Sequence, residues 1–346
     1  MCGCVFLQMS DKMLLNSVSL LTFLEDNHLD RYHFSWISSI FYFGYLAGCF
    51  IHGYFVQRVN LNRYVTVIIM VWEVVLTCDR ACHTYGSFLA VRFFLGLFEA
   101  AITPSFILLT GRFYTRKEQV IRMNIWFSMN GIAQILAGAA TYAVSVNSLS
   151  LISRWQELFL VYGIIAILFG FIGFFFMPNS PETTTYLSEK ERGVAIWRIA
   201  SNQSGIHDST WKWEQFREAI TDLRLYLFFL GYVCLIIVNG GITTYGNVII
   251  KSFHYDNKQS SLLSMTIGGG EIVSVYLGAF MFHVINRRDL PMVLGLLVAL
   301  AGAILMVAIP EEAKAGRMTG YALVSFFSIP LPMYYTWQST AVSGTT

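Results

Sequence analysis

The sequence predicts an all-α integral membrane protein with about ten transmembrane helices. Of its 346 residues, 55% are hydrophobic and only 13% are charged, which is about half the charged fraction of an average soluble domain. Apolar runs of roughly 20 residues, the length that crosses a hydrocarbon core about 30 Å thick, recur along the chain. Short segments rich in charged and turn-forming residues separate these runs, as expected of a helical bundle in a membrane.

The predicted spans form a set of six and a set of four. We expect an N-terminal six-helix bundle over 1–177, a cytosolic linker over 178–222 and an incomplete C-terminal bundle of four helices over 223–346. At the end of the linker, around Trp213, the apolar residues recur with helical spacing, as in an amphipathic helix at the membrane interface. In chain order the spans cover residues 1–24, 34–56, 64–81, 86–112, 120–145, 157–177, 223–250, 259–284, 290–309 and 318–340.

Basic residues in the short loops predict the orientation of the chain. Eight Lys and Arg residues lie in the three loops after the second, fourth and eighth spans, against seven in the five loops of opposite parity. Positive charge favours the cytosolic side, so we expect a cytosolic N-terminus. The chain opens directly into apolar sequence, which argues against a removable signal peptide. We expect a monomer embedded in the lipid bilayer of the plasma membrane.

The distribution of reactive side chains excludes several function classes. The seven histidines are scattered, and the six cysteines do not have the spacing of a metal site. No nucleophile–base set appears, and no basic arm accompanies the net charge of +2. We therefore expect no enzymatic activity, no metal, no cofactor and no nucleic-acid partner.

The fourth span carries two charges that lipid disfavours. Each charge near the centre of a membrane helix costs roughly 2.5–3.5 kcal/mol on insertion scales. Arg92 and Glu99 lie seven residues apart in the sequence, so a helix places them on one face about 10 Å from each other. This face predicts a polar groove inside a helical bundle. Glu73 is a further charge, and it interrupts the third span.

The first span supplies possible partners for these charges, because Asp11 and Lys12 lie near its middle. Two interpretations stay open. The four residues can form a static ion-pair cluster that fixes helix packing. Alternatively, the acids Asp11 and Glu99 take up protons while the bases Lys12 and Arg92 attract an anion, since ionisable residues inside a membrane often mark ion and substrate pathways.

Other polar residues within the spans have less specific patterns. Asn130 and Gln134 of the fifth span, and Asn239 and Tyr245 of the seventh, can line the same cavity as the charges. They can equally form hydrogen bonds between packed helices. Glu271 of the eighth span is either a third intramembrane acid or the partner of a neighbouring base.

Several motifs together resemble a known family. The segment Arg92–Glu99 reads RFFLGLFE, Met177–Arg192 reads MPNSPETTTYLSEKER and Asn239–Thr243 reads NGGIT. With the Asp11-Lys12 pair and the basic loop after the fourth span, they resemble the anion:cation symporters of the major facilitator superfamily. The fungal allantoate permease group is the most similar, and the likeness covers essentially the whole chain.

The resemblance implies a major facilitator-type helical bundle that works by alternating access. Its implied activity is proton-coupled symport of a small organic anion, of the allantoate or ureide, vitamin carboxylate or short-peptide class. By the same resemblance, Asp11 and Glu99 match the proton-carrying acids, and Lys12 and Arg92 match the paired basic positions. Lys12 stands where many relatives have Arg, which keeps the charge but loses the bidentate fork.

The resemblance also implies twelve helices, of which the sequence accounts for ten. The family pattern has a polar leader before the first helix and two further helices after the tenth. We therefore expect a truncated member with an incomplete C-terminal half. The alternative to a symporter is a homologue without transport activity or a nutrient sensor.

Overall fold

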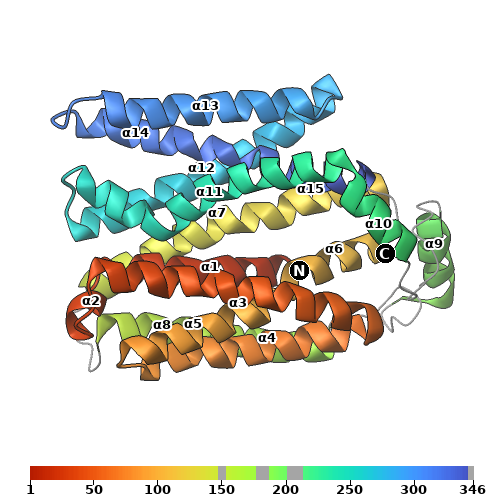
Figure 1. Ribbon diagram of the computed structural model, residues 1–346, viewed down its shortest axis with the longest axis horizontal. Helices are drawn as coiled ribbons and strands as arrows, with labels where there is room; N and C mark the ends of the chain where they lie inside the picture. The colour runs from red at the N-terminus through yellow and green to blue at the C-terminus, as the bar shows by residue number, and fades with distance from the viewer. Residues whose placement is uncertain (147–152, 177–186, 201–212, 342–346) are drawn as a thin grey trace. The chain divides into compact units, whose positions relative to one another are not determined.

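The computed structural model describes residues 1–146, 153–176, 187–200 and 213–341, and the secondary structure in these ranges is helical, without strands. Figure 1 shows the helices with their labels. They form two compact units. The first comprises Met1, Leu21–Gln119 and Asn147–Ile206, and the second comprises Cys2–Leu20, Val120–Val146 and His207–Thr346. Most of the MPNSPETTTYLSEKER motif, residues 177–186, lies outside the described ranges.

The first unit is built around four long helices. Polar residues begin three of them. The Asp30 carboxylate accepts a hydrogen bond from the His33 amide at 2.7 Å, the Asn60 side chain accepts one from the Arg63 amide at 3.5 Å, and the Thr84 hydroxyl accepts one from the Ser87 amide at 3.3 Å. Such caps satisfy amides that have no partner within the helix. The elements are α2 (Phe23–Asp26), α3 (Arg31–Arg58), α4 (Leu61–Cys78), η1 (Asp79–Ala81), α5 (Tyr85–Glu99), α6 (Ile102–Phe113), α8 (Arg154–Phe176) and α9 (Glu189–Ala200).

Helices α3 and α5 pack backbone against backbone. A Cβ atom at Gly44 would clash with the carbonyl oxygen of Phe93, and one at Gly96 would clash with the carbonyl oxygen of Phe41. Gly44 and Gly48 have the four-residue spacing of small residues that lets membrane helices approach closely. This contact fixes α5, and with it Arg92 and Glu99, against α3.

The expected fourth span is present as one candidate membrane segment, Tyr85–Thr110, but its helix is interrupted. Instead of one helix over 86–112, α5 ends at Glu99 and α6 starts at Ile102. Pro104 explains the break, because proline has no amide hydrogen for the carbonyl four residues earlier and its ring collides with that carbonyl. The break places Glu99 at the junction between the two helical segments.

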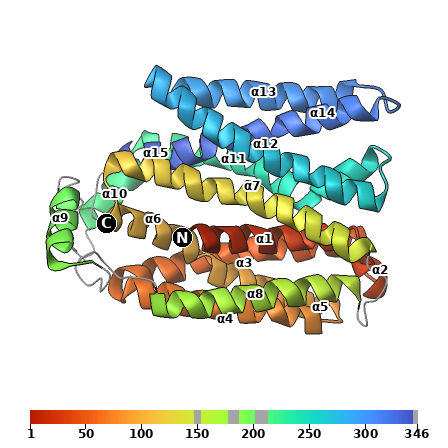
Figure 2. The ribbon, with the colours of Figure 1, turned by 180° about the vertical axis from the view of Figure 1, so that it is seen from behind.

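The second unit contains α1 and the C-terminal helices. Figures 1 and 2 show α13 and α14 side by side within it. Helix α7 (Arg116–Val146) starts in the first unit and continues in the second from Val120. The other elements are α1 (Cys2–Val18), α10 (Trp213–Thr221), α11 (Leu223–Ser252), α12 (Asn257–Ile285), α13 (Asp289–Ala308), α14 (Lys314–Val324), η2 (Ser325–Ser328) and α15 (Pro330–Ala341).

Among the described residues, seven helical segments are long and apolar enough to cross a membrane. They begin at Arg31, Leu61, Tyr85, Arg154, Leu223, Asn257 and Asp289. The expected span 1–24 is shorter, because α1 ends at Val18. The expected span 318–340 is divided by the 3₁₀ turn Ser325–Ser328, just before Pro330. The helix expected near Trp213 is confirmed as α10, whereas α9 was not predicted.

Candidate functional site

Arg92 forms an ion pair inside the first unit, and its partner is Asp79. The Nη2 atom of Arg92 lies 3.2 Å from Oδ2 of Asp79, and the two side chains are 4% and 0% exposed. The Arg92 guanidinium also lies over the ring of Phe159, 5.5 Å from its centroid. The pair connects α5 to η1, at the end of α4. The sequence analysis missed Asp79. Its position directly after an apolar run could have marked it as a possible partner for a buried base.

Glu99 is fully buried, and a second acid, Glu73 of α4, lies close enough to interact with it electrostatically. Glu73 is also fully buried, and neither of its carboxylate oxygens has a hydrogen-bond partner among the described residues. Helix α4 runs through Glu73 without a break. Glu73 therefore does not interrupt the span, as the sequence suggested, but contributes an acid to its buried face.

A histidine links three helices of the first unit. Buried His52 of α3 has its Nε2 atom 2.8 Å from the carbonyl oxygen of Leu97 and its Nδ1 atom 2.5 Å from the Tyr64 hydroxyl. A carbonyl oxygen can only accept, so Nε2 carries the hydrogen. In the neutral ring, Nδ1 therefore accepts from Tyr64. This arrangement holds α3, α4 and α5 together two residues before Glu99.

Asp11 and Lys12 lie on α1, in the second unit. Asp11 is 1% exposed. Lys12 is half-buried and interacts electrostatically with Tyr232 of α11, whose hydroxyl is hydrogen-bonded to the hydroxyl of Tyr335. Lys12 therefore stands beside an aromatic, hydroxyl-bearing cluster. The expected pairing of Asp11 and Lys12 with Arg92 and Glu99 stays a prediction.

The remaining predicted residues have different surroundings. Buried Gln134 donates from Nε2 to the Ser264 carbonyl at 3.5 Å, a hydrogen bond between α7 and α12 that fits the packing interpretation. Asn130 and Asn239 are half-buried, and Tyr245 is 37% exposed. The roles of these four residues in binding substrate stay predictions.

Glu271 lies in a group of hydroxyls within the second unit. It is hydrogen-bonded to the Ser328 side chain and interacts electrostatically with Tyr321, both of which are buried. These neighbours favour the interpretation of Glu271 as an intramembrane acid over its interpretation as the partner of a base. Nearby, Asn247 of α11 donates from Nδ2 to the Asn16 carbonyl of α1 at 3.1 Å. Sequence reasoning missed Asn16, Asn247 and Tyr321, because single polar residues in long apolar runs carry no spacing signal.

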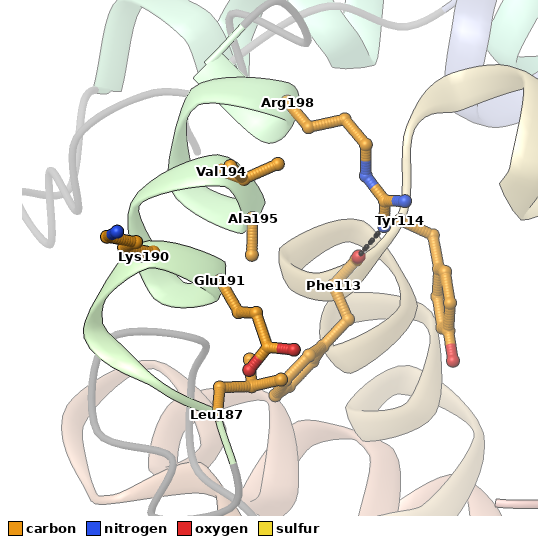
Figure 3. Close-up of a pocket in the computed structure, with 8 residues that line it drawn as sticks. All are labelled: Phe113, Tyr114, Leu187, Lys190, Glu191, Val194, Ala195 and Arg198. Carbon is orange, nitrogen blue, oxygen red and sulfur yellow. Dashed lines mark hydrogen bonds between the residues drawn. The ribbon is translucent and has the colours of Figure 1, made fainter.

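A surface groove lies between the end of α6 and helix α9, with a volume of about 460 Å³. Figure 3 shows its apolar and charged side chains. Just before α9, the amide and hydroxyl of Ser188 both donate to the carboxylate of Glu191, and these hydrogen bonds lower the pKa of Glu191 below its ordinary value. The lining residues are Phe113, Tyr114, Leu187, Lys190, Glu191, Val194, Ala195 and Arg198.

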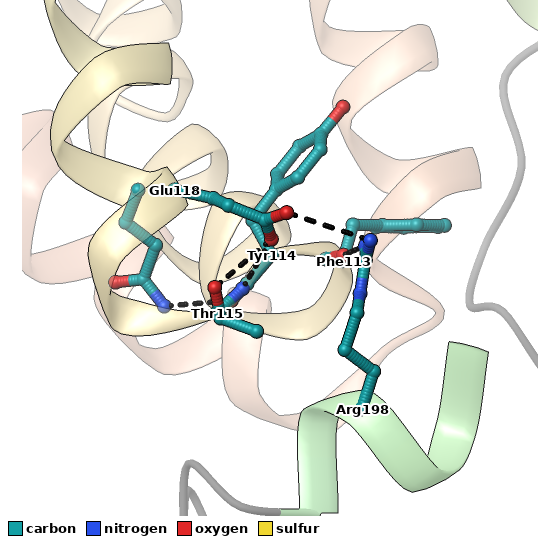
Figure 4. Close-up of polar contacts among 6 residues, drawn as sticks. Phe113, Tyr114, Thr115, Glu118 and Arg198 are labelled. Carbon is teal, nitrogen blue, oxygen red and sulfur yellow. Dashed lines mark hydrogen bonds and ion pairs between the residues drawn. The ribbon is translucent and has the colours of Figure 1, made fainter. Parts of the chain in front are cut away.

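Arg198 attaches α9 to the last residue of α6 and to the first turn of α7, as Figure 4 shows. Its guanidinium lies 3.4 Å from Oε1 of Glu118 and donates to the Phe113 carbonyl at 3.5 Å. The Glu118 carboxylate also accepts from the amide and hydroxyl of Thr115, each at 3.0 Å, and so caps α7. All these contacts lie in the first unit, outside the apolar spans.

Comparison with known proteins identifies the family. The model of the Major Facilitator Superfamily matches residues 1–345. The chain belongs to this superfamily. This membership agrees with the buried charges and polar clusters of the helical units, and it confirms the resemblance seen in the sequence. The matched relatives described below are transporters and not enzymes.

Fungal transporters are among the similar proteins. The chain is 32% identical to the allantoate permease of Saccharomyces cerevisiae over 83% of this chain and 54% of the permease. It is 30% identical to an uncharacterized transporter of Schizosaccharomyces pombe over 100% of this chain and 68% of that protein. A thiamine pathway transporter of Saccharomyces cerevisiae is 27% identical over 100% of this chain and 66% of its own length. The chain thus spans from about half to two-thirds of these relatives.

Solved structures show the same fold. A bacterial homologue of the human lysosomal transporter Spinster, in an inward-facing conformation, matches with a TM-score of 0.70 at 16% identity, over 99% of this chain and 74% of that chain. The xylose transporter XylE from E. coli matches with a TM-score of 0.68 at 13% identity, over 97% of this chain and 85% of that chain. The expected major facilitator-type helical bundle is therefore confirmed.

Proposed function

We propose that this chain is the transport-competent part of a proton-coupled symporter for a small organic anion, working by alternating access. The observation that carries the proposal is the burial of both Arg92 and Glu99 on one helix of a chain related to an allantoate permease. Ionisable groups are costly inside a membrane and are usually functional there. Allantoate carries one carboxylate, so a buried base is the complementary group.

In this proposal Arg92 exchanges partners. Its guanidinium pairs with the Asp79 carboxylate at 3.2 Å, and the carboxylate of the substrate replaces Asp79 when it binds. Exchange of one carboxylate for another keeps the Arg92 cation neutralised throughout. The displaced Asp79 carboxylate then needs water or a proton, because an unpaired buried charge costs several kcal/mol. Lys12, beside the hydroxyl of Tyr232, is the second base for the anion.

Protons are taken up by Asp11 and Glu99, the two buried acids assigned to coupling. Asn130, Gln134, Asn239 and Tyr245 supply hydrogen bonds to the polar remainder of the substrate. The protein acts as a monomer in the plasma membrane, with its N-terminus in the cytosol. The basic loops on the cytosolic side support this orientation.

Uptake into proteoliposomes tests the proposal. We expect the purified chain to accumulate labelled allantoate, or another member of a panel of ureides, vitamin carboxylates and short peptides, when the outside is acidic. Dissipation of the gradient with a protonophore should abolish accumulation. Glu99→Gln should abolish driven uptake but leave substrate exchange intact, whereas Glu189→Gln, an exposed acid on α9, should behave as wild type. Absence of uptake across the whole panel would reject a symporter, and substrate binding without uptake would favour a sensor.

A further inference from the structure

The structure contains a buried acid to which the proposed transport cycle gives no role. Glu73 lies on the inner face of α4, where Ile69, Trp72 and Leu76 are also buried. These neighbours are apolar or aromatic, and the Glu73 oxygens have no hydrogen-bond partner among the described residues. A bare carboxylate in such surroundings costs several kcal/mol. Glu73 therefore needs a proton, a cation or a donor.

The helices packed against α4 provide few charged groups near Glu73. From α5, Glu99 interacts with it electrostatically, and Arg92 is already paired with Asp79 of η1. From α3, the ring of His52 has both nitrogens occupied, by the Tyr64 hydroxyl and the Leu97 carbonyl. Arg112 of α6 lies outside the described side chains, and the other residues of α6 carry no charge.

The register between α4 and α8 places the titratable groups of α8 away from Glu73. Gly163 faces Thr77, whereas Gly170 faces Met70, so the helices run antiparallel and the fully buried Ala166 is at the level of Glu73. Tyr162 is therefore level with the end of α4. Gln156 donates to the Arg80 carbonyl at 3.3 Å, which puts its neighbour Glu157 beside η1, about two turns or more from Glu73.

We propose that Glu73 is a second proton-binding carboxyl of the transport cycle and that Glu73 and Glu99 share one proton while both are enclosed. Two carboxylates in close proximity away from water cannot both be ionised, and the first proton then belongs to the pair. This inference rests on the proposed function, because it adds a residue to the same proton site. When the site opens to water, the shared proton leaves and the two negative charges are solvated.

A pair of carboxyls has a property that a lone carboxyl lacks. A proton shared by two enclosed carboxylates is held more tightly than by one, so the pair loads at a higher pH. Loss of Glu73 leaves a single carboxyl, and loading of the site should then need a lower pH. Glu73 thus sets the pH range of coupling, whereas Glu99 stays the residue on the face shared with Arg92.

Proteoliposome uptake of allantoate as a function of outside pH tests this role. Glu73→Gln keeps the shape and removes the charge, and it should shift the pH of half-maximal driven uptake by about one unit or more toward acid. Exchange without a gradient should stay at the wild-type rate, and Glu73→Asp should restore part of the shift. Glu189→Gln is the control for a Glu→Gln change at an exposed site. Identical pH profiles for wild type, Glu73→Gln and Glu189→Gln would overturn the inference while leaving the symporter proposal intact.

Infrared titration of the protonated-carboxyl band tests the shared proton without transport. We expect the band of purified wild type to persist to a higher pH than that of Glu73→Gln, and Glu99→Gln to show the reciprocal loss. If Glu73→Gln fails to fold, the carboxyl band of the Glu99→Gln protein still tests whether the two residues share a proton. A band with the same amplitude and midpoint in all variants would exclude a shared proton, even in a chain that transports no allantoate.

Discussion

The ion pair between Arg92 and Asp79 predicts a large effect for the change Asp79→Asn. The charges are 3.2 Å apart, and the side chains are 4% and 0% exposed. At an effective dielectric constant near 20, this separation corresponds to an attraction of about 5 kcal/mol. Breaking a buried pair by removing one partner usually costs about 3–5 kcal/mol, because the other charge stays buried without compensation. We therefore expect Asp79→Asn to lower the free energy of unfolding by about 3–5 kcal/mol.

Unfolding of the purified protein in mixed micelles measures this effect. The double variant Asp79→Leu/Arg92→Met should have most of the wild-type stability, because its apolar replacements remove both charges together and leave neither one buried alone. The same Asp79→Asn variant should bind a labelled organic anion more tightly, because no internal carboxylate competes for Arg92. Wild-type stability in Asp79→Asn would show that Arg92 does not depend on Asp79, and unchanged anion affinity would reject the exchange of partners.

Three further predictions concern the first unit. Gly44→Ala should destabilise it by about 1–3 kcal/mol through overpacking, whereas Gly53→Ala on the same helix, where a Cβ meets open space, should unfold like wild type; equal effects would contradict the close α3–α5 contact. Tyr64→Phe leaves Nδ1 of buried His52 without its donor and should cost about 1–3 kcal/mol in the free energy of unfolding, and a smaller loss would show that water replaces the hydroxyl. Ser188→Ala should raise the pKa of Glu191 only part of the way back from its lowered value in an NMR titration, because alanine removes the hydroxyl donor but keeps the amide donor, which is the larger cause. Because the lowered pKa belongs to the folded helix, this interaction stabilises α9 above the unfolded pKa and is lost as the pH falls through the folded value; an unchanged pKa would rule out the Ser188 hydroxyl as a cause.

Much of the fold follows from the lengths of the apolar runs. The structure has helices at each of the ten expected spans, because roughly 20 apolar residues in lipid can satisfy their backbone groups only as a helix. The expectation of an uninterrupted helix was wrong in two of these spans, and each break has a local cause. Pro104 divides the fourth span after Glu99, and Ser325–Ser328 before Pro330 divides the tenth. Hydropathy does not register either break, because proline and serine change the mean value of a long run very little.

The candidate site was less predictable, because partners are set by tertiary packing. Seven-residue spacing put Arg92 and Glu99 on one face of a helix, since that relation is local, and both residues lie on the buried face of α5. Their neighbours come from other elements, Asp79 from η1 and Glu73 from α4, and no spacing in the sequence connects them with α5. Glu73 was interpreted as a defect in a span because a charge lowers hydropathy whether its side chain faces lipid or another acid.

Simultaneous measurement of anion and proton movement tests the central proposal most directly. Proteoliposomes containing the chain and an internal pH-sensitive dye receive labelled allantoate outside, with no initial pH gradient. Symport predicts that anion entry acidifies the lumen, and that Glu99→Gln exchanges the anion without any proton signal. Anion entry in wild type with no change in luminal pH would contradict proton coupling.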